Sequence, residues 1–103
     1  SADLSSLEIA LTFLKQQGGS LKRTVILSDF LESGELDAEL YAQIALLLQQ
    51  VSVHRLITIG PRIGSAFSSL LGNWQLEQYV DNTHFVQQFE ARKFQQEIIL
   101  INF

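Results

Sequence analysis

Runs of consecutive apolar residues alternate along this chain with stretches in which apolar residues recur every three or four positions. The runs cover residues 24–28, 55–59 and 97–101 and are rich in isoleucine, leucine and valine. Such runs are typical of strands that are buried on both faces of a parallel sheet. Residues 75–80 alternate less regularly and carry glutamine and glutamate, so we predict a further strand there, the third along the chain, at an edge of the sheet.

The first helical pattern precedes all four strands. A capping box formed by Ser5 and Glu8 predicts its start, and Gly18 is expected to end it as a left-handed C-cap residue. The apolar stripe by which this helix is predicted to pack on the sheet comprises Leu7, Ile9, Ala10, Leu11, Phe13 and Leu14.

Three further helices complete the alternation of helix and strand. Asp37 is the expected N-cap of a helix over residues 38–50, Pro61 lies in the first turn of the next helix, and Asp81 begins a cap for a short last one. Two successive βα units argue for parallel strands joined by right-handed crossovers. We therefore predict one domain over residues 1–103 with a three-layer, Rossmann-like α/β fold, whose mainly parallel sheet has the strand order 3-2-1-4.

The predicted strand order has two consequences. The switch point falls between the first and fourth strands, so Asp29 and Asn102 would flank one crevice. The fourth strand would also lie at an edge, although its pattern is that of a buried strand. Either residues beyond Phe103 cover it in a longer protein, or two copies of the chain associate there as a homodimer.

Composition narrows the functional classes. The formal net charge of −4 argues against nucleic acid or an anionic membrane as a partner. No apolar run approaches the roughly 18 to 20 residues that span a bilayer. The absence of cysteine excludes disulfides and cysteine-based metal sites. Because the chain also lacks methionine and begins at Ser1, we expect it to be a piece of a longer protein.

Candidate chemistry centres on Asp29, which follows the first buried strand at the end where open α/β sheets bind ligands. Its carboxylate could hold a ribose hydroxyl, a magnesium-bound water or a substrate amine, or it could cap a helix or turn in the following loop. Glu32 is expected to be solvated. At the end of the second strand, Gly60-Pro61-Arg62 could bind an anion at a helix N-terminus with Arg62 as the counter-charge, or it could form an ordinary βα turn.

No residue of the chain is assigned a catalytic role. Asp29 has no identifiable base or nucleophile beside it in the sequence. His54 and His84 have no partner at metal-ligand spacing, so no metal site is predicted. Trp74 is expected to pack in the core or at an edge of the sheet.

Three segments of the chain resemble the C-terminal domain of the Mur ligases. They are residues 6–11 (Ser-Leu-Glu-Ile-Ala-Leu), 24–34 (Thr-Val-Ile-Leu-Ser-Asp-Phe-Leu-Glu-Ser-Gly) and 56–61 (Leu-Ile-Thr-Ile-Gly-Pro). The likeness in order and spacing runs across essentially the whole chain. It is greatest to the branch that adds D-alanyl-D-alanine in peptidoglycan synthesis, in which the first strand ends Gly-Asp-Met-x-Glu-Leu-Gly and the second Gly-Pro.

Departures from that pattern point to one branch of the family. Ser28 stands where the pattern has glycine, Phe30 where it has methionine and Tyr41 where it has histidine. Asn102-Phe103 replaces the Lys-Gly expected at the end of the last strand. The Ser-Asp-x-x-x-Ser-Gly variant with tyrosine resembles the branch in which the ligase is fused ahead of a pyridoxal-phosphate alanine racemase.

The resemblance implies a cytoplasmic, ATP-dependent amide ligase that joins D-alanyl-D-alanine to a UDP-muramoyl-tripeptide. It implies that a central domain outside this chain holds ATP and magnesium, that the C-terminal domain closes on this central ligase domain and helps to bind the small-molecule substrates, and that pyridoxal phosphate is present only if a racemase follows. By motif match, Asp29 is the first residue to carry over to the substrate or nucleotide pocket. Glu32 and Gly34 would shape its loop, and Asp3 would lie near the hinge. Alone, the chain is expected to be catalytically silent.

A competing interpretation is a non-catalytic Rossmann-like module that serves as a spacer or dimerisation element attached to alanine racemase. The absent lysine and the exposed last strand favour it. A receiver-like phospho-acceptor role for Asp29 is disfavoured, because the acidic cluster and the lysine that such chemistry needs are not evident.

Overall fold

Helices and strands alternate along the chain in the computed structural model, which describes residues 4–29, 38–70, 72–88 and 96–102. The elements are α1 (Leu4–Gly18), β1 (Lys22–Ser28), α2 (Ala38–Gln50), β2 (Arg55–Ile59), α3 (Pro61–Ser68), β3 (Gln75–Tyr79), α4 (Asn82–Gln88) and β4 (Glu97–Asn102). None of the helices in these described ranges is both long enough and apolar enough to cross a membrane.

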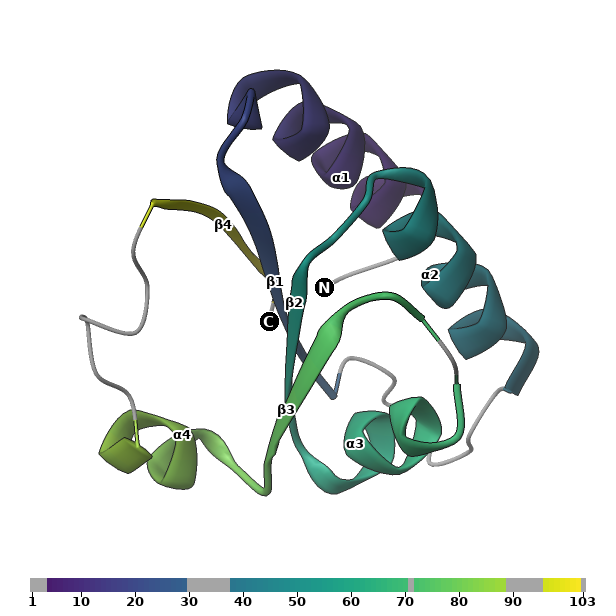
Figure 1. Ribbon diagram of the computed structural model, residues 1–103. Helices are drawn as coiled ribbons and strands as arrows, with labels where there is room; N and C mark the ends of the chain where they lie inside the picture. Colours follow the sequence, from purple (N-terminus) through teal and green to yellow (C-terminus); the bar gives the residue numbers. More distant parts are fainter. Residues whose placement is uncertain (1–3, 30–37, 71, 89–95, 103) are drawn as a thin grey trace.

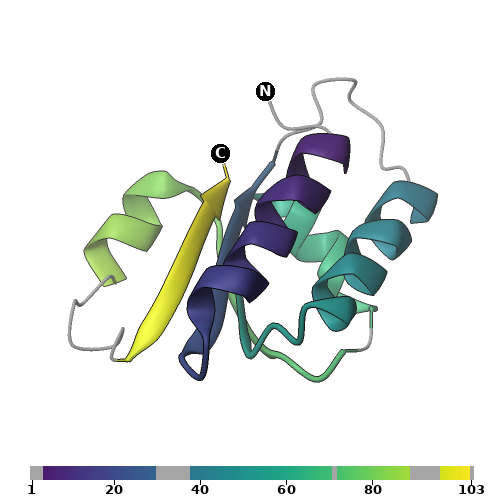
Figure 2. The ribbon, with the colours of Figure 1, turned by 90° about the horizontal axis from the view of Figure 1, so that it is seen from above.

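The four strands form one parallel sheet in the order β3-β2-β1-β4, which confirms the predicted fold class and strand order. Helices α1, α2 and α3 lie on one face of the sheet and α4 lies on the other (Figures 1 and 2). Right-handed crossovers explain this division. The chain steps from β1 to β2 to β3 in one direction and then returns across the sheet to β4, so the returning helix falls on the opposite face.

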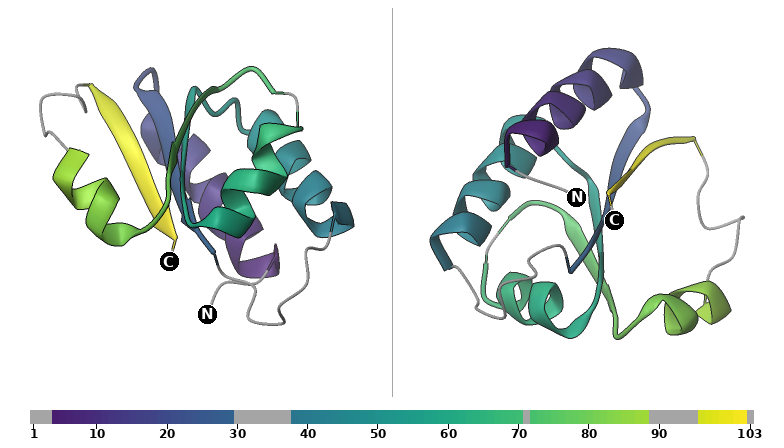
Figure 3. Two further views of the ribbon diagram at one scale, coloured as in Figure 1. Left: turned by 90° about the horizontal axis from the view of Figure 1, so that it is seen from below. Right: turned by 180° about the vertical axis from the view of Figure 1, so that it is seen from behind.

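The larger hydrophobic core lies between the sheet and the three-helix layer. It buries alternate residues of the central strands, among them Val25, Leu27 and Leu56, against aliphatic side chains of the helices. A smaller cluster on the other face is made of Ile26, Ile57, Ile59, Tyr79 and Phe85. The views from below and from behind show α4 as the one helix on that face among the described residues (Figure 3). The sheet is therefore packed much more heavily on one side than on the other.

The predicted apolar stripe of α1 is partly wrong. Leu7, Leu11 and Leu14 are buried as expected, but 72% of Ile9 and 61% of Phe13 are exposed. At about 100° per residue, Ile9 and Phe13 lie on roughly the opposite side of the helix from Leu7 and Leu11. They form a second stripe that faces away from the sheet.

The ends of α1 also differ from the prediction. The helix begins at Leu4, so Ser5 lies inside it and is not the N-cap. Gly18 is the last helical residue, and the left-handed conformation belongs to Gly19, with φ 55°. Gly18 is needed for another reason: a Cβ there would lie 2.9 Å from the side chain of Ile98 on β4. The glycine pair thus combines a close helix–strand contact with a helix stop.

Strand β4 is an edge strand, as the predicted order requires. It pairs with β1 along its length, from Lys22 opposite Glu97 to Leu27 opposite Asn102. Its apolar side chains are less well covered than those of β1 and β2, because Ile99 is 38% exposed and Ile101 is 54% exposed.

Candidate functional site

The side chain of Asp29 caps helix α3. Its Oδ1 atom accepts a hydrogen bond of 2.7 Å from the backbone N–H of Ile63, and Oδ2 accepts one of 3.3 Å from the N–H of Arg62. The backbone N–H of Asp29 donates to the carbonyl of Ile59 at 3.0 Å, which continues the β1–β2 ladder one residue past the end of β1. The structure therefore brings together Asp29 and Arg62, which the sequence places 33 residues apart.

The local sequence of α3 explains why the cap comes from a neighbouring strand. The position before the helix is Gly60, which has no side chain to act as a cap, and Pro61 occupies the first turn. Gly60 adopts φ 121°, and a Cβ at this position would lie 2.5 Å from the carboxyl carbon of Asp29. Glycine thus leaves room for the carboxylate, whose charge is favoured at the positive end of the helix.

The two candidate sites of this region, the Asp29 carboxylate and the N-terminus of α3, therefore bind each other. The carboxylate was predicted to bind a ligand or cap a helix, and the helix N-terminus was predicted to bind an anion or form a turn. In the structure the amides of Arg62 and Ile63 bind the Asp29 carboxylate. Asp29 therefore caps the helix that follows β2, while the loop that follows β1 lies outside the described residues.

Tyr41 lies beside this pair. It is 1% exposed and its ring packs edge-on against Phe67, with ring centroids 6.0 Å apart. Burial raises the pKa of the Tyr41 hydroxyl, the negative charge of Asp29 raises it further, and Arg62 lowers it. We call Asp29, Tyr41 and Arg62 the carboxyl-end cluster, because they gather where β1 and β2 end.

A groove next to the cluster runs between α2 and α3. It has a volume of about 270 Å³. It is lined by Ala38, Tyr41, Ser65, Ala66, Ser69 and Leu70. Small side chains and the hydroxyls of Ser65 and Ser69 make this groove suitable for a small molecule that has both apolar and hydrogen-bonding groups.

The structure describes only some of the remaining residues that were predicted to form a pocket. Asp3, Glu32 and Gly34 lie outside the described residues. The backbone of Asn102 pairs with Leu27, two residues before Asp29, so it reaches the switch point between β1 and β4; its side chain is not among those described.

The described residues do not fit a bound magnesium ion or nucleotide phosphate. They contain no group of three histidine, cysteine, aspartate or glutamate side chains placed to hold a metal. The two α3 amides that would face a phosphate already bind Asp29. His54 instead accepts a hydrogen bond at Nδ1 from the backbone of Arg23, and the ring of His84 packs edge-on against Tyr79.

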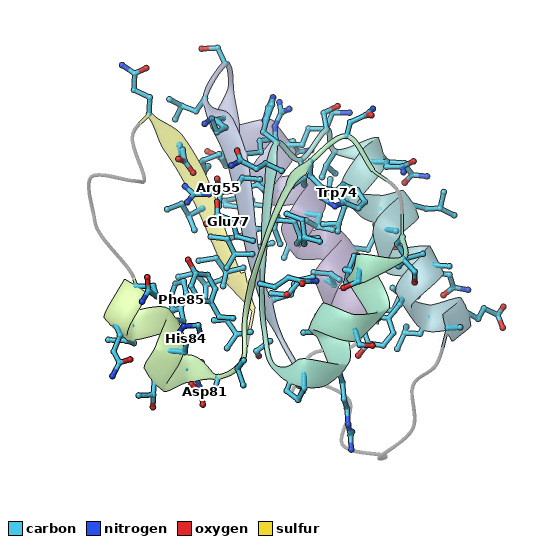
Figure 4. The ribbon with its side chains drawn as sticks, turned by 60° about the horizontal axis from the view of Figure 1, so that its bottom comes forward. Arg55, Trp74, Glu77, Asp81, His84 and Phe85 are labelled. Carbon is cyan, nitrogen blue, oxygen red and sulfur yellow. The ribbon has the colours of Figure 1, made fainter. Side chains whose placement is uncertain are left out.

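A charged network on the opposite face of the sheet was not predicted. Arg55 on β2 contacts Glu77 on β3 through both Nε and Nη2, the latter at 3.0 Å from Oε1, and Glu97 on β4 at 3.3 Å. The Thr24 hydroxyl on β1 donates to Glu97. Figure 4 shows Arg55 and Glu77 together on the side of the sheet that carries α4. The hydrogen bond to Glu77 is the largest cause that raises the pKa of Arg55, while burial lowers it.

The sequence did contain a signal for this network. Arg55 and Glu97 are charged residues at the starts of apolar strands, and Glu77 interrupts the apolar pattern of β3. With the strand order 3-2-1-4, these charges fall on adjacent or nearby strands, where pairing is the way to bury them.

Comparison of the chain with protein-family models, with curated proteins and with solved structures finds no match.

Proposed function

We propose that this chain is the C-terminal closing and substrate-binding domain of a cytoplasmic, ATP-dependent amide ligase of the Mur ligase type, which adds D-alanyl-D-alanine to a UDP-muramoyl-tripeptide. The proposal extends to a ligase that is fused to a pyridoxal-phosphate alanine racemase. ATP and magnesium would be held mainly by a central domain outside this chain.

The observation that carries the proposal is the position of Asp29. It belongs to residues 24–34, one of the segments that resemble the family, and it directly follows β1 at the switch point of a 3-2-1-4 parallel sheet, where such folds bind ligands. Its bonds to the amides of Arg62 and Ile63 hold the Asp29 carboxylate in one position at the start of α3. We assign the carboxyl-end cluster to the face that closes on the central domain.

The course of the backbone supports the same orientation. Helix α1 begins at the end of the sheet where β1 and β4 finish (Figure 2), and Asp29 directly follows β1. A domain joined ahead of α1 would therefore meet this end of the sheet. The groove between α2 and α3 opens beside Tyr41 and is the part of this face that we assign to the small incoming substrate.

The alternative is a non-catalytic Rossmann-like module attached to alanine racemase. The capping bonds of Asp29 favour it, because they give this residue a structural role that needs no ligand. A ligase domain would need the negative charge of Asp29, whereas a structural module would need only a side-chain oxygen that caps α3.

The test compares ATP-dependent phosphate release by the longer protein with Asp29→Asn and Asp29→Ala variants, given a UDP-muramoyl-tripeptide and D-alanyl-D-alanine. Asparagine is a good helix cap, so Asp29→Asn should fold and keep α3 in place. If the charge of Asp29 serves the closed ligase, we expect turnover to fall by about tenfold or more in both variants, which corresponds to at least about 1.4 kcal/mol.

The matched control is Asp81→Asn. Asp81 caps α4 by accepting a 2.7 Å hydrogen bond from the backbone of His84, so this variant changes a capping aspartate outside the carboxyl-end cluster. Turnover should stay near that of the wild type. No ligase turnover in the wild type, with racemase activity intact, would refute the proposal and favour the structural module.

A further inference from the structure

One edge of β4 is open in the structure. Its other edge pairs with β1 over six residue pairs, whereas no strand pairs with the open edge in the described part of the chain. An open edge leaves a row of backbone N–H and C=O groups able to bind another strand.

The two edge strands of the sheet differ in how they discourage such pairing. β3 carries Glu77 and Gln78 in its middle, and the Gln78 side chain donates to the carbonyl of Gly64 at 2.6 Å. β4 instead has four consecutive aliphatic residues, 98–101, with no charge, proline or glycine among them. Ile99 and Ile101 are 38% and 54% exposed beside this edge. β4 thus lacks the features that normally protect an edge strand.

Charge does not oppose self-association at this strand. Each copy carries a net charge of −4, but the one ionisable side chain of β4 is Glu97, which is buried against Arg55 and Thr24. The apolar stretch that follows it can therefore approach its own copy without bringing uncompensated like charges together.

We propose that β4 is a dimerisation edge at which the β4 strands of two copies pair in antiparallel orientation. A two-fold axis normal to the sheet generates this pair and keeps the three-helix layers of both copies on the same side. Two four-stranded sheets then become one continuous sheet. Ile99 and Ile101 of both copies meet on the more open face and cover one another.

The residue pattern favours one register. With Leu100 on the two-fold axis, Ile99 lies opposite Ile101 of the partner subunit, and Leu100 lies opposite the partner's Leu100. With Ile99 on the axis, Glu97 would lie opposite the partner's Ile101, which sets a carboxylate against an aliphatic side chain. The first register keeps aliphatic residues together, and cross-strand pairs of this kind stabilise antiparallel strands.

Sedimentation velocity of the 103-residue chain over a wide concentration range tests the dimer. We expect a reversible dimer in the wild type and association weakened about tenfold or more by Ile101→Lys, since a charge on an edge strand opposes pairing. Val86→Lys is the matched control: Val86 is 68% exposed on α4, on the same face but away from the edge. It should leave the dimer intact. Circular dichroism melting checks that both variants fold.

Single cysteine substitutions test the register of the two β4 strands. The chain has no cysteine of its own, so every disulfide forms at the introduced position. Under mild oxidation Leu100→Cys should form a disulfide dimer faster than Ile98→Cys, since only residue 100 faces its own copy within disulfide range. Leu46→Cys, at a 57% exposed position on α2, measures the rate of crosslinking that random collision alone produces.

A chain that stays monomeric at all concentrations, a dimer unaffected by Ile101→Lys, or equal crosslinking at positions 46, 98 and 100 would overturn the proposal. So would a longer chain that is monomeric and protects the β4 amides from hydrogen exchange, because its own continuation would then occupy the edge.

Discussion

Asp29 and Tyr41 lie together at the carboxyl end of the sheet, although the sequence singles them out in different ways. Asp29 is conspicuous because it ends an apolar run. Its partner could not be predicted from that run, because the bonds to Arg62 and Ile63 depend on the β1–β2 register, in which Ser28 lies opposite Ile59. Tyr41 attracted notice only through its departure from the family pattern.

The buried hydroxyl of Tyr41 predicts a stability change at alkaline pH. Its pKa is raised in the folded chain above the ordinary tyrosine value of 10.0, so its contribution to stability is fully present below pH 10.0 and is lost as the pH rises through the folded-state pKa. We expect the free energy of unfolding to fall above pH 10.0, and to fall less steeply in Tyr41→Phe. Urea unfolding at several pH values measures both slopes.

Tyr79 is the natural comparison, since it is the only other tyrosine and its pKa is also raised, first by burial and then by the charge of Glu77. It is less buried than Tyr41. Tyr79→Phe should therefore reduce the alkaline slope less than Tyr41→Phe does. Equal slopes in the wild type and Tyr41→Phe would contradict the assignment.

The helices show which of their features the apolar periodicity of the sequence can predict. The pattern predicted residues 38–50 as a helix, and α2 has these bounds. For α1 the same kind of pattern predicted one wide stripe that included Ile9 and Phe13, but only Leu7, Leu11 and Leu14 are buried in the packed structure. For α3 the start was expected from Pro61, but the cap that completes it comes from another element.

The trans cap of α3 predicts a measurable loss of stability. Asp29→Ala removes the acceptor of two amides at a helix N-terminus, and we expect it to lower the free energy of unfolding by about 1 kcal/mol, within a range of roughly 0.5–2. Asp29→Asn keeps an acceptor and should cost less. Urea unfolding of the 103-residue chain decides between them; an Asp29→Ala chain as stable as the wild type would show that the cap contributes little.

The sheet as a whole has one densely packed face and one that combines a small apolar cluster with a charged network. Figure 4 shows Trp74 on the side of the three helices and the Arg55–Glu77 pair on the other. The network ties β2 to both edge strands, because Arg55 reaches Glu77 on β3 and Glu97 on β4. Burying two carboxylates requires the cation between them.

Removal of the Arg55 guanidinium should lower the free energy of unfolding. Arg55→Met leaves Glu97, whose side chain is 2% exposed, without its positive partner. We expect a loss of about 3–5 kcal/mol in the free energy of unfolding. The triple variant Arg55→Met, Glu77→Gln, Glu97→Gln should recover a large part of this loss, since no charge is then left buried. Chemical denaturation of the three chains measures the difference, and a loss below about 1 kcal/mol in Arg55→Met would refute a buried network.

The local order of hydrophobic and polar residues was enough to determine the alternation of helix and strand, the parallel sheet and its 3-2-1-4 order, because burial period and crossover handedness leave few other arrangements. Which side of α1 is buried, which helix Asp29 caps and how Arg55, Glu77 and Glu97 meet were decided only by the tertiary structure. These features join residues that are distant along the chain, and they depend on register and layer, which no local pattern encodes.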